Sequence, residues 1–378
     1  MEQATTQDGT PGFLSKFKVE LATDDWAQFH WRLGLRRIPA VLILLTAAGA
    51  CHAISVGVLA AGTALSVGFA PAHPIGNSRT LAMTATACAM TVCGFVGIVT
   101  GNSYPLALAG AALGGFVFAY LALGNEDTGW IAMQGVLAFL IGAYYPGSWA
   151  LAGGRAGCIL LGGTVQTLSL SLIWHLEGIG HRGAEPAEAI AAAPIKNSQW
   201  LEFLSIKPLS WPVLRFSLRV AATLALAVEL DHLLQLKNGY WLPMTTLVVL
   251  KPDFSHTYSG AIQRVVGTLA GVVLASLITK LLHPNQWVLI GMVAAFCWST
   301  FSTQKVNAVM FSTSLTVFVV LLIALTGLPE SEVVWHRFIN TLMGCTLALT
   351  SYFAGIFMVH RAFNHAPEAM AAGSSARR

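Results

Sequence analysis

Apolar runs separated by glycine, proline, asparagine or charged residues recur along the whole chain. A membrane-spanning helix needs roughly 20 predominantly apolar residues, and most of the runs approach that length. The candidate spans lie at residues 38–54, 55–70, 80–100, 104–123, 129–146, 154–174, 212–230, 240–250, 262–282, 286–302, 307–326 and 336–358. The pattern predicts an all-α polytopic membrane protein with about 12 transmembrane helices.

Arginines in the two halves of the chain are related by a nearly constant separation. The pairs are Arg37 with Arg219, Arg79 with Arg264, and Arg155 with Arg337, which lie 182, 185 and 182 positions apart. Arginines are scarce in membrane helices, so three such pairs indicate an internal duplication. Because each half holds an even number of spans, both halves enter the membrane from the same side. Two parallel six-helix repeats are predicted, at residues 38–174 and 212–358.

Three polar segments flank the predicted repeats. Residues 1–37 lack an early apolar run, so no cleavable signal is expected. Within them, residues 13–37 mix aromatic and charged side chains, as an amphipathic helix on the inner membrane surface would; a plain solvated leader is the alternative. Residues 175–211 form a predicted cytoplasmic linker, and residues 359–378 form a predicted disordered cytoplasmic tail.

Composition and charge agree with this topology. Hydrophobic residues make up 55% of the chain and charged residues 10%, and the mean hydropathy is +0.65. If both termini are cytoplasmic, the cytoplasmic segments hold 17 of the 21 basic residues, as the positive-inside rule requires. The four exceptions are Arg155, Lys237, Lys280 and Arg337. We interpret the net charge of +4 as a consequence of topology, not of nucleic-acid binding.

No motif in the sequence indicates an enzyme. A phosphate-binding G-x-x-x-x-G-K-[ST] loop is absent, and there is no zinc-ligand, catalytic-triad or paired-carboxylate arrangement. The six cysteines lie inside apolar runs without metal-ligand spacing, and we expect them to be small buried hydrophobic residues. Neither a metal nor a cofactor is expected.

Two of the predicted spans are short and interrupted at matching positions. The run at residues 240–250 contains Pro243, and its counterpart at residues 57–70 is rich in glycine and is followed by Pro71 and Pro74. Broken backbone inside a membrane must be satisfied by protein, water or substrate. Matched broken helices therefore indicate the binding site of a transporter.

Basic and aromatic residues gather around these interruptions. An anion with an aromatic body needs cations for its carboxylate and rings for the remainder. The candidate substrate-binding residues are Arg79, Arg155, Tyr240, Trp241, Lys251, Phe254, Arg264 and Arg337. The alternative is that the cations are anchors that snorkel to lipid headgroups and that the aromatic residues form an interfacial belt.

Acidic and histidine side chains near the same segment are candidates for proton coupling. Histidine is the side chain whose charge changes near neutral pH, and the candidates are His256 and Asp253, which lies three residues before it. Asp253 could equally cap the next helix or pair with Lys251. Glu229 and Asp231, at the outer end of the seventh predicted span, form a second acidic candidate or are simply exposed loop charges.

The segment "YWLPMTTLVVLKPDF...AIQRVVGTLAG" resembles the fusaric acid resistance family of bacterial inner-membrane proteins, which includes aromatic acid exporters. The matching residues are Tyr240, Trp241, Pro252, Arg264, Gly267, Thr268 and Gly271. A similar pattern occurs in plant aluminium-activated malate transporters. The resemblance covers the second half directly and the first half only through the repeat, and the large cytoplasmic domain of the bigger exporters is absent from this chain.

This resemblance implies a multi-pass inner-membrane protein that exports organic anions. The leading hypothesis is a proton-driven exporter of small organic, in particular aromatic, carboxylates. The alternatives are a passive organic-anion channel and a scaffold subunit of an envelope complex without transport of its own. The expected partners are the anion and the lipid bilayer; a periplasmic adaptor and a homo-oligomer are left open.

Overall fold

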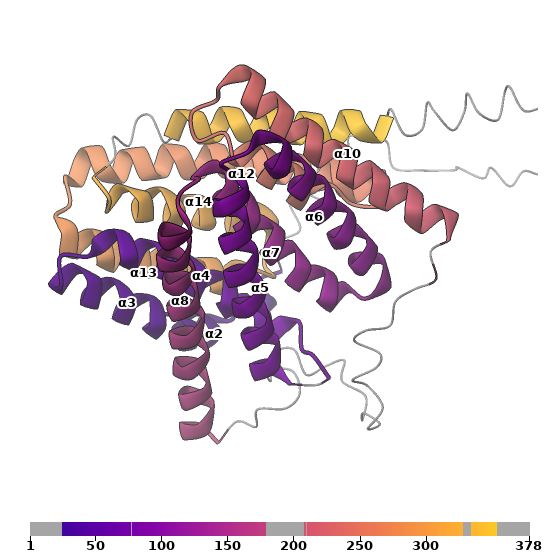
Figure 1. The fold of residues 1–378 in the computed structure, drawn as a ribbon. Coiled ribbons are helices and arrows are strands. Elements are labelled where there is room, and N and C mark those ends of the chain that lie inside the picture. Colours follow the sequence, from indigo (N-terminus) through magenta and orange to yellow (C-terminus); the bar gives the residue numbers. More distant parts are fainter. Residues whose placement is uncertain (1–24, 77, 179–207, 209, 328–333, 354–378) are drawn as a thin grey trace, which may run out of the picture.

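The computed structural model describes residues 25–76, 78–178, 208, 210–327 and 334–353, and these residues form helices and connecting turns (Figure 1). The first half contains α2 (Trp31–Arg37), α3 (Pro39–Ala50), α4 (Ile54–Phe69), α5 (Arg79–Thr100), α6 (Tyr104–Gly124), α7 (Glu126–Tyr144) and α8 (Trp149–Leu176). The second half contains α10 (Trp211–Leu234), α11 (Trp241–Val249), α12 (Phe254–Leu282), α13 (Gln286–Thr303), α14 (Ala308–Ala324) and a last helix at residues 334–353. The 3₁₀ helices η1 (Trp26–Gln28) and η2 (Ala70–Ala72) are short.

The predicted all-α polytopic fold is confirmed. Each of the twelve predicted spans coincides with one helix, and seven helices of the described part are long and apolar enough to cross a membrane. Helix α11 is much shorter, because Leu250 is already extended and Pro252 follows it. The linker at residues 179–207, the tail beyond residue 353 and most of the predicted amphipathic segment lie outside the described residues.

The described end of the N-terminal segment packs against the second half. Helix α2 runs almost directly into α3, and Gly34 lies where a side chain would collide with the backbone of Trp298 on α13. Arg36 forms an ion pair of 2.7 Å with Glu177 at the end of α8. Residues 31–37 are therefore tied to helices of both halves.

The internal duplication is visible in the helix packing. In the first half α5 packs on α7, α6 on α7, and α3 on α4; in the second half α12 packs on α14, α13 on α14, and α10 on α11. A Cβ atom added at Gly162 would overlap the carbonyl oxygen of Ala60, and one added at Gly344 would lie 2.7 Å from that of Leu242. Gly162 and Gly344 are 182 positions apart, and so are Ala60 and Leu242. This is the separation of two of the three arginine pairs.

The halves are interlocked in a reciprocal way. Helix α10 packs on α6 while α3 packs on α13, and α11 packs on α7 while α4 packs on α14. Accordingly, one apolar core joins α3 and α4 to α13 and α14, and an equivalent core joins α10 and α11 to α6 and α7. The seam between the halves is thus part of the hydrophobic interior.

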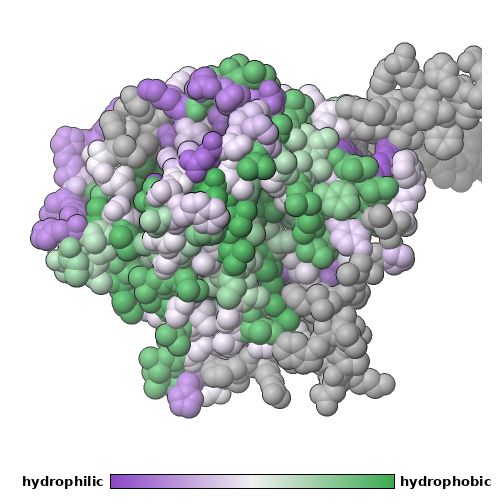
Figure 2. Space-filling model, viewed as in Figure 1, coloured by the Kyte–Doolittle hydropathy of each residue, from purple (hydrophilic) through white to green (hydrophobic). Residues whose placement is uncertain are grey.

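The outer surface of the helices is apolar. Figure 2 shows hydrophobic side chains over the middle of the visible face, with hydrophilic residues gathered towards its upper and left edges. Leu113, Val92 and Leu168 are more than half exposed on three different helices. Such a surface suits lipid contact.

The cysteines correct one expectation. All six are free thiols, but Cys297 and Cys345 alone are buried; Cys51 and Cys88 are exposed, and Cys93 and Cys158 are half-buried. An apolar outer surface explains the difference, because a small apolar side chain facing lipid needs no burial within the protein.

The close approach at Gly162 yields a test of the repeat packing. Gly162→Ala should destabilise the protein by about 1–3 kcal/mol, since the new methyl group meets the backbone of α4. Thermal unfolding of the detergent-purified protein measures the effect. Gly157→Ala, on an open face of the same helix, is the matched control and should unfold at or above the parental temperature. Equal unfolding temperatures for the two variants would contradict the packing.

Candidate functional site

Four aromatic rings from the two halves form one cluster beside the short helix α11. This aromatic cluster consists of Tyr144 and Tyr145 at the end of α7 and Tyr240 and Trp241 at the start of α11. The ring centroids of Tyr240 lie 5.1 Å from Tyr144, 5.7 Å from Tyr145 and 4.8 Å from Trp241. Helix α11 packs on α7, and its first turn places these rings in the seam between the halves.

Arg337 lies on the Trp241 side of the aromatic cluster. Its Cζ atom is 3.9 Å from the centroid of the Trp241 ring, and the residue is 2% exposed. Its Nη2 donates to the hydroxyl of Thr316 at 3.5 Å. A guanidinium group over an indole face is a favourable cation–π arrangement, more so where water is excluded. Three of the predicted residues, Tyr240, Trp241 and Arg337, are therefore brought together.

Arg155, the repeat counterpart of Arg337, contacts the other side of the same cluster. Its Nη1 donates to the backbone carbonyl of Tyr145 at 2.6 Å, and its side chain is partly exposed. Asn340, one turn after Arg337, donates to the carbonyls of Lys237 and Asn238 at 3.1 and 3.0 Å, and so holds the loop before α11. Two matched arginines thus flank one set of rings.

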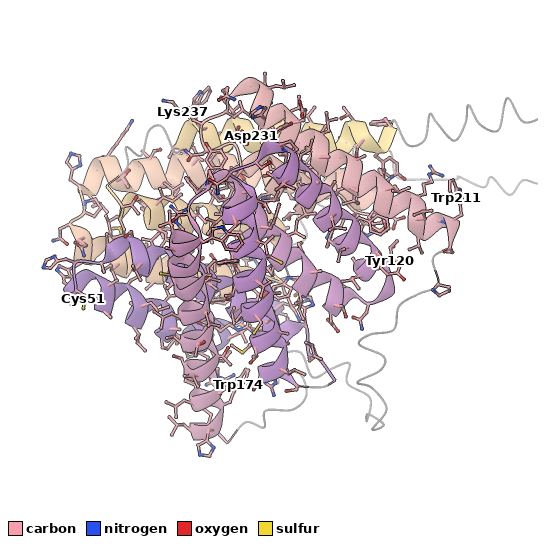
Figure 3. All side chains as sticks on the ribbon, viewed as in Figure 1. Cys51, Tyr120, Trp174, Trp211, Asp231 and Lys237 are labelled. Atoms are coloured by element: carbon pink, nitrogen blue, oxygen red, sulfur yellow. The ribbon has the colours of Figure 1, made fainter. Side chains whose placement is uncertain are left out.

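The other predicted arginines lie in different surroundings. Arg79 is buried on α5 with its Cζ atom 4.8 Å from the centroid of Trp174. Figure 3 places Trp174 at the opposite end of the molecule from Asp231 and Lys237. Arg264, on α12, lies close enough to Arg337 for the two positive charges to repel each other. Arg79 is therefore distant from the loop of Lys237, whereas Arg264 is near Arg337.

The remaining predicted residues occupy the junction between α11 and α12. Lys251 is exposed, and its backbone is held by the hydroxyl of Thr257 and by Arg219. Asp253 and His256 form a pair with a nitrogen–oxygen distance of 3.8 Å, and their side chains are 76% and 75% exposed. Phe254 is the first residue of α12. The structure keeps this group apart from the buried aromatic cluster.

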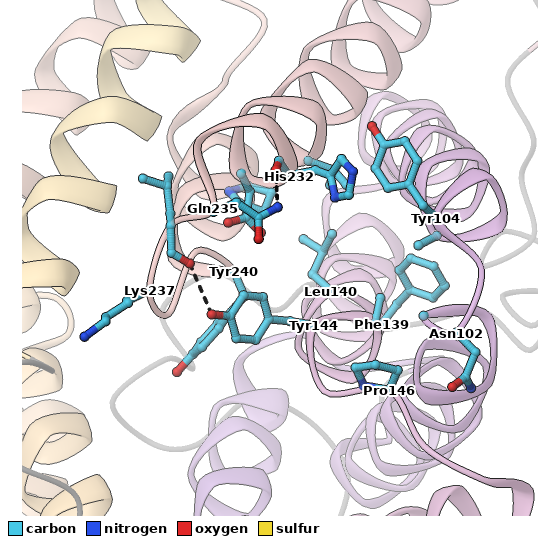
Figure 4. Close-up of a pocket in the computed structure, with 17 residues that line it drawn as sticks. Asn102, Tyr104, Phe139, Leu140, Tyr144, Pro146, His232, Gln235, Lys237 and Tyr240 are labelled. Carbon is cyan, nitrogen blue, oxygen red and sulfur yellow. Dashed lines mark hydrogen bonds between the residues drawn. The ribbon is translucent and has the colours of Figure 1, made fainter.

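A cavity of about 560 Å³ opens in the seam next to the aromatic cluster (Figure 4). Helices α6 and α7 of the first half and α10 and α11 of the second half contribute to its wall. The lining side chains include Asn102, Tyr104, Phe139, Leu140, Tyr144, Asp231, His232, Gln235, Lys237 and Tyr240. The hydroxyl of Tyr144 donates to the carbonyl of Leu236 at 3.2 Å and ties the two halves together there.

Most of this wall could not be found in the sequence. Tyr104, Phe139 and Tyr144 lie in ordinary apolar spans of the first half, and only the packing of α10 and α11 on α6 and α7 brings them to one cavity. The local signal for the cavity wall in the sequence is the pair of tyrosines, Tyr144 and Tyr145, that precedes Pro146 at a predicted helix end.

Acidic groups line the end of α10. The hydroxyl of Tyr104 donates to the carboxylate of Glu229, and its ring stacks on His232 with a centroid distance of 4.0 Å. Asp231 lies one residue beyond the predicted span at 212–230, and its carboxyl group packs on Gly239. Burial raises the pKa of Asp231 to about 6, and the charge of His232 acts in the opposite direction. The cavity thus holds a carboxyl group that titrates close to neutral pH.

The described residues offer no metal site, because no three His, Cys, Asp or Glu side chains cluster among them. The chemistry available at the cavity is therefore that of aromatic stacking, hydrogen bonding and charge.

The fold defines an all-α polytopic membrane protein. Residues 222–351 match the family described as fusaric acid resistance protein-like, so the second half of the chain is similar to this family. The resemblance noted in the sequence is confirmed over that region.

Relatives match over the same share of the chain. They include an uncharacterized protein of Synechocystis (31% identical over 150 residues, 39% of this chain and 19% of the relative) and an uncharacterized protein of Neisseria gonorrhoeae (29% over 139 residues, 36% and 32%). The inner membrane protein YccS of Escherichia coli is 27% identical over 136 residues, 35% of this chain and 18% of the relative. The matched region thus spans about a fifth to a third of these relatives. No solved structure matches the chain.

The stacking of Arg337 on Trp241 can be tested by substitution. Trp241→Leu should lower the free energy of unfolding by about 2 kcal/mol or more, because a buried cation loses its aromatic face and a cavity is left. Thermal unfolding in detergent measures the loss. Trp287→Leu removes an exposed tryptophan and should have little effect. An unchanged unfolding temperature for the first variant would show that the stacking does not contribute to stability.

Proposed function

We propose that this protein exports small organic, in particular aromatic, carboxylate anions across the bacterial inner membrane. The observation that carries the proposal is the cavity at the seam, with the rings of Tyr104, Phe139, Tyr144 and Tyr240 in its wall. Ligand sites of this kind combine an apolar, aromatic lining with a few polar groups that fix orientation. The family match and the printed name of YccS support a transport role and an inner-membrane location.

The cations are assigned to successive positions along the path. Lys251, exposed at the junction of α11 and α12, lies at the predicted cytoplasmic side with Arg79, and Arg264 lies further along α12, near Arg337. Arg337 and Arg155 flank the aromatic cluster. In this proposal the carboxylate moves between cations while the aromatic body of the substrate packs on the rings, and both chain termini lie in the cytoplasm.

Filling the cavity tests its role as the substrate site. Ala107 is buried in the cavity wall on α6, and Ala109 is exposed on the same helix. Ala107→Phe should reduce flux of radiolabelled benzoate from proteoliposomes by tenfold or more, because the ring occupies the space for the substrate. Ala109→Phe should retain parental flux. Equal flux in the two variants, at equal reconstitution, would exclude the cavity from the path.

Protonation of Asp231 should govern anion binding in the cavity. Above pH 6 the carboxylate of Asp231 repels a bound carboxylate, and below pH 6 the neutral acid does not. Benzoate, largely ionised throughout, should bind about tenfold more tightly at pH 5 than at pH 7, a difference of ~1.4 kcal/mol. Asp231→Asn should bind benzoate with the same affinity at both pH values. Glu126→Gln, which removes an exposed acid, should bind benzoate with the pH dependence of the parent. If benzoate binding to Asp231→Asn keeps the pH dependence of the parent, that dependence arises from another group, such as His232 or Glu229.

Coupling to protons remains assigned to Asp253 and His256, whose exposed pair can exchange protons with water. An imposed pH gradient should accelerate benzoate flux several-fold in the parent and not in Asp253→Asn. Flux that ignores the gradient would indicate a passive channel, and absence of flux for aromatic acids and dicarboxylates would indicate a scaffold subunit.

A further inference from the structure

We infer that the second half of the protein contains a resident site for a small monovalent inorganic anion, such as chloride, between Arg264 and Arg337. This site lies beside Trp241, whose ring Arg337 covers. It does not depend on the proposed transport, because an anion held there would stabilise the fold whether or not organic anions cross the membrane.

The first observation is the set of unused donors on Arg337. The residue is 2% exposed, and its Nε and Nη1 atoms are buried without a hydrogen-bond partner. Its one hydrogen bond, from Nη2 to Thr316, is long at 3.5 Å. A guanidinium group carries five N–H donors and remains charged in proteins. Most of the donor capacity of Arg337 is therefore directed into the interior and unmet.

Other unmet donors surround Arg337. The indole Nε1 of Trp241 and the hydroxyl of Ser312 are both buried and without a partner. Ser312 lies one helical turn before Thr316, on the face of α14 that packs on Gly267 and Gly271. Arg264 precedes Gly267 by one turn. Donors from α11, α12, α14 and the last helix thus converge on one region.

The second observation is the charge balance. The guanidinium groups of Arg264 and Arg337 are close enough to repel each other, and no carboxylate of the described residues lies within the 4.0 Å of an ion pair to either. Arg337 is buried and Arg264 is partly buried, and a charge placed in the interior without a counter-charge costs several kcal/mol. A bound anion would neutralise one charge and accept from the idle donors, and so it removes both penalties at once.

The first half provides an internal comparison. Arg155, at the position equivalent to Arg337, is partly exposed and donates to the carbonyl of Tyr145, whereas Arg79, equivalent to Arg264, packs on Trp174. These two arginines belong to different clusters. The duplication therefore produces equivalent positions in both halves, but of these matched pairs it is Arg264 and Arg337 that come together, as a local anion site requires.

The size and charge of the anion follow from the packing. Helices α12 and α14 approach so closely at Gly267 and Gly271 that a Cβ atom at either glycine would lie 2.5 or 2.6 Å from a side chain of α14. There is accordingly little room for a body larger than the charged group itself. The site has one pair of neighbouring cations, Arg264 and Arg337. Such a pair suits an anion with one negative charge. A halide fits both conditions, and the bare carboxylate of an organic anion is the competing source of the same charge.

The test measures thermal unfolding of the detergent-purified protein while chloride replaces methanesulfonate, which carries no carboxylate, at constant ionic strength. Binding to the folded state alone should raise Tm in a saturable way, by about 2 °C or more at saturation. Bromide should act like chloride. Benzoate stabilisation without any halide effect would identify the carboxylate as the occupant and overturn the inorganic site, and no response to any of the anions would overturn it as well.

Two variants and one direct measurement complete the test. Arg337→Gln should raise the half-saturating chloride concentration by tenfold or more, whereas Lys280→Gln, which removes an exposed charge from α12, should leave it unchanged. Equal shifts in both variants would indicate general screening and refute the site. If Arg337→Gln does not fold, anomalous diffraction from bromide-grown crystals of the parent decides: a peak between Arg264 and Arg337 supports the inference, and its absence there overturns it.

Discussion

Arginine packed on an aromatic ring is the interaction on which the interior of this protein depends. Arg37 lies over Phe301, Arg79 over Trp174, Arg219 over Phe216 and Tyr352, and Arg337 over Trp241. A guanidinium group placed among apolar helices cannot be left without compensation. An aromatic face supplies negative potential without adding a carboxylate, so the chain keeps several positive charges inside a helical membrane fold while few acids are buried with them.

The short helix α11 places one of these arginine–aromatic contacts, that of Arg337 with Trp241, beside the cavity. Its first turn meets Tyr144 and Tyr145, and its last residue comes only two positions before the exposed Lys251. The same turn places Trp241 under Arg337. The cavity then forms on the other side of Tyr240, because α10 ends at Leu234 and a loop, rather than helix, connects it to α11.

The sequence contains enough to predict the helices, the duplication and the importance of the segment around Tyr240, because these depend on local apolar runs and on regular arginine spacing. It does not contain the environment of each arginine. Arg155 and Arg337 occupy equivalent positions, and yet one reaches a carbonyl near the surface and the other an indole in the interior. The two arginines differ because different helices pack beside them. The spacing of residues along the chain does not determine that packing. The same limit applies to Tyr104 and Phe139, which become cavity residues only through α10.

The divergence of the two halves has a physical consequence for transport. In a perfectly symmetric duplicate, matched arginines would face the central seam from both sides with equal charge, and a carboxylate between them would have no preferred direction. Here one side presents Arg155 at the surface, and the other presents Arg337 behind Trp241 with Arg264 beyond it. The positive charges near the seam are therefore unequal in the two halves, and the acidic end of α10, with Glu229 and Asp231, lies at the cavity. In the proposed transport an anion in the seam would meet a different charge on each side, and protonation of Asp231 would change the charge at the acidic end.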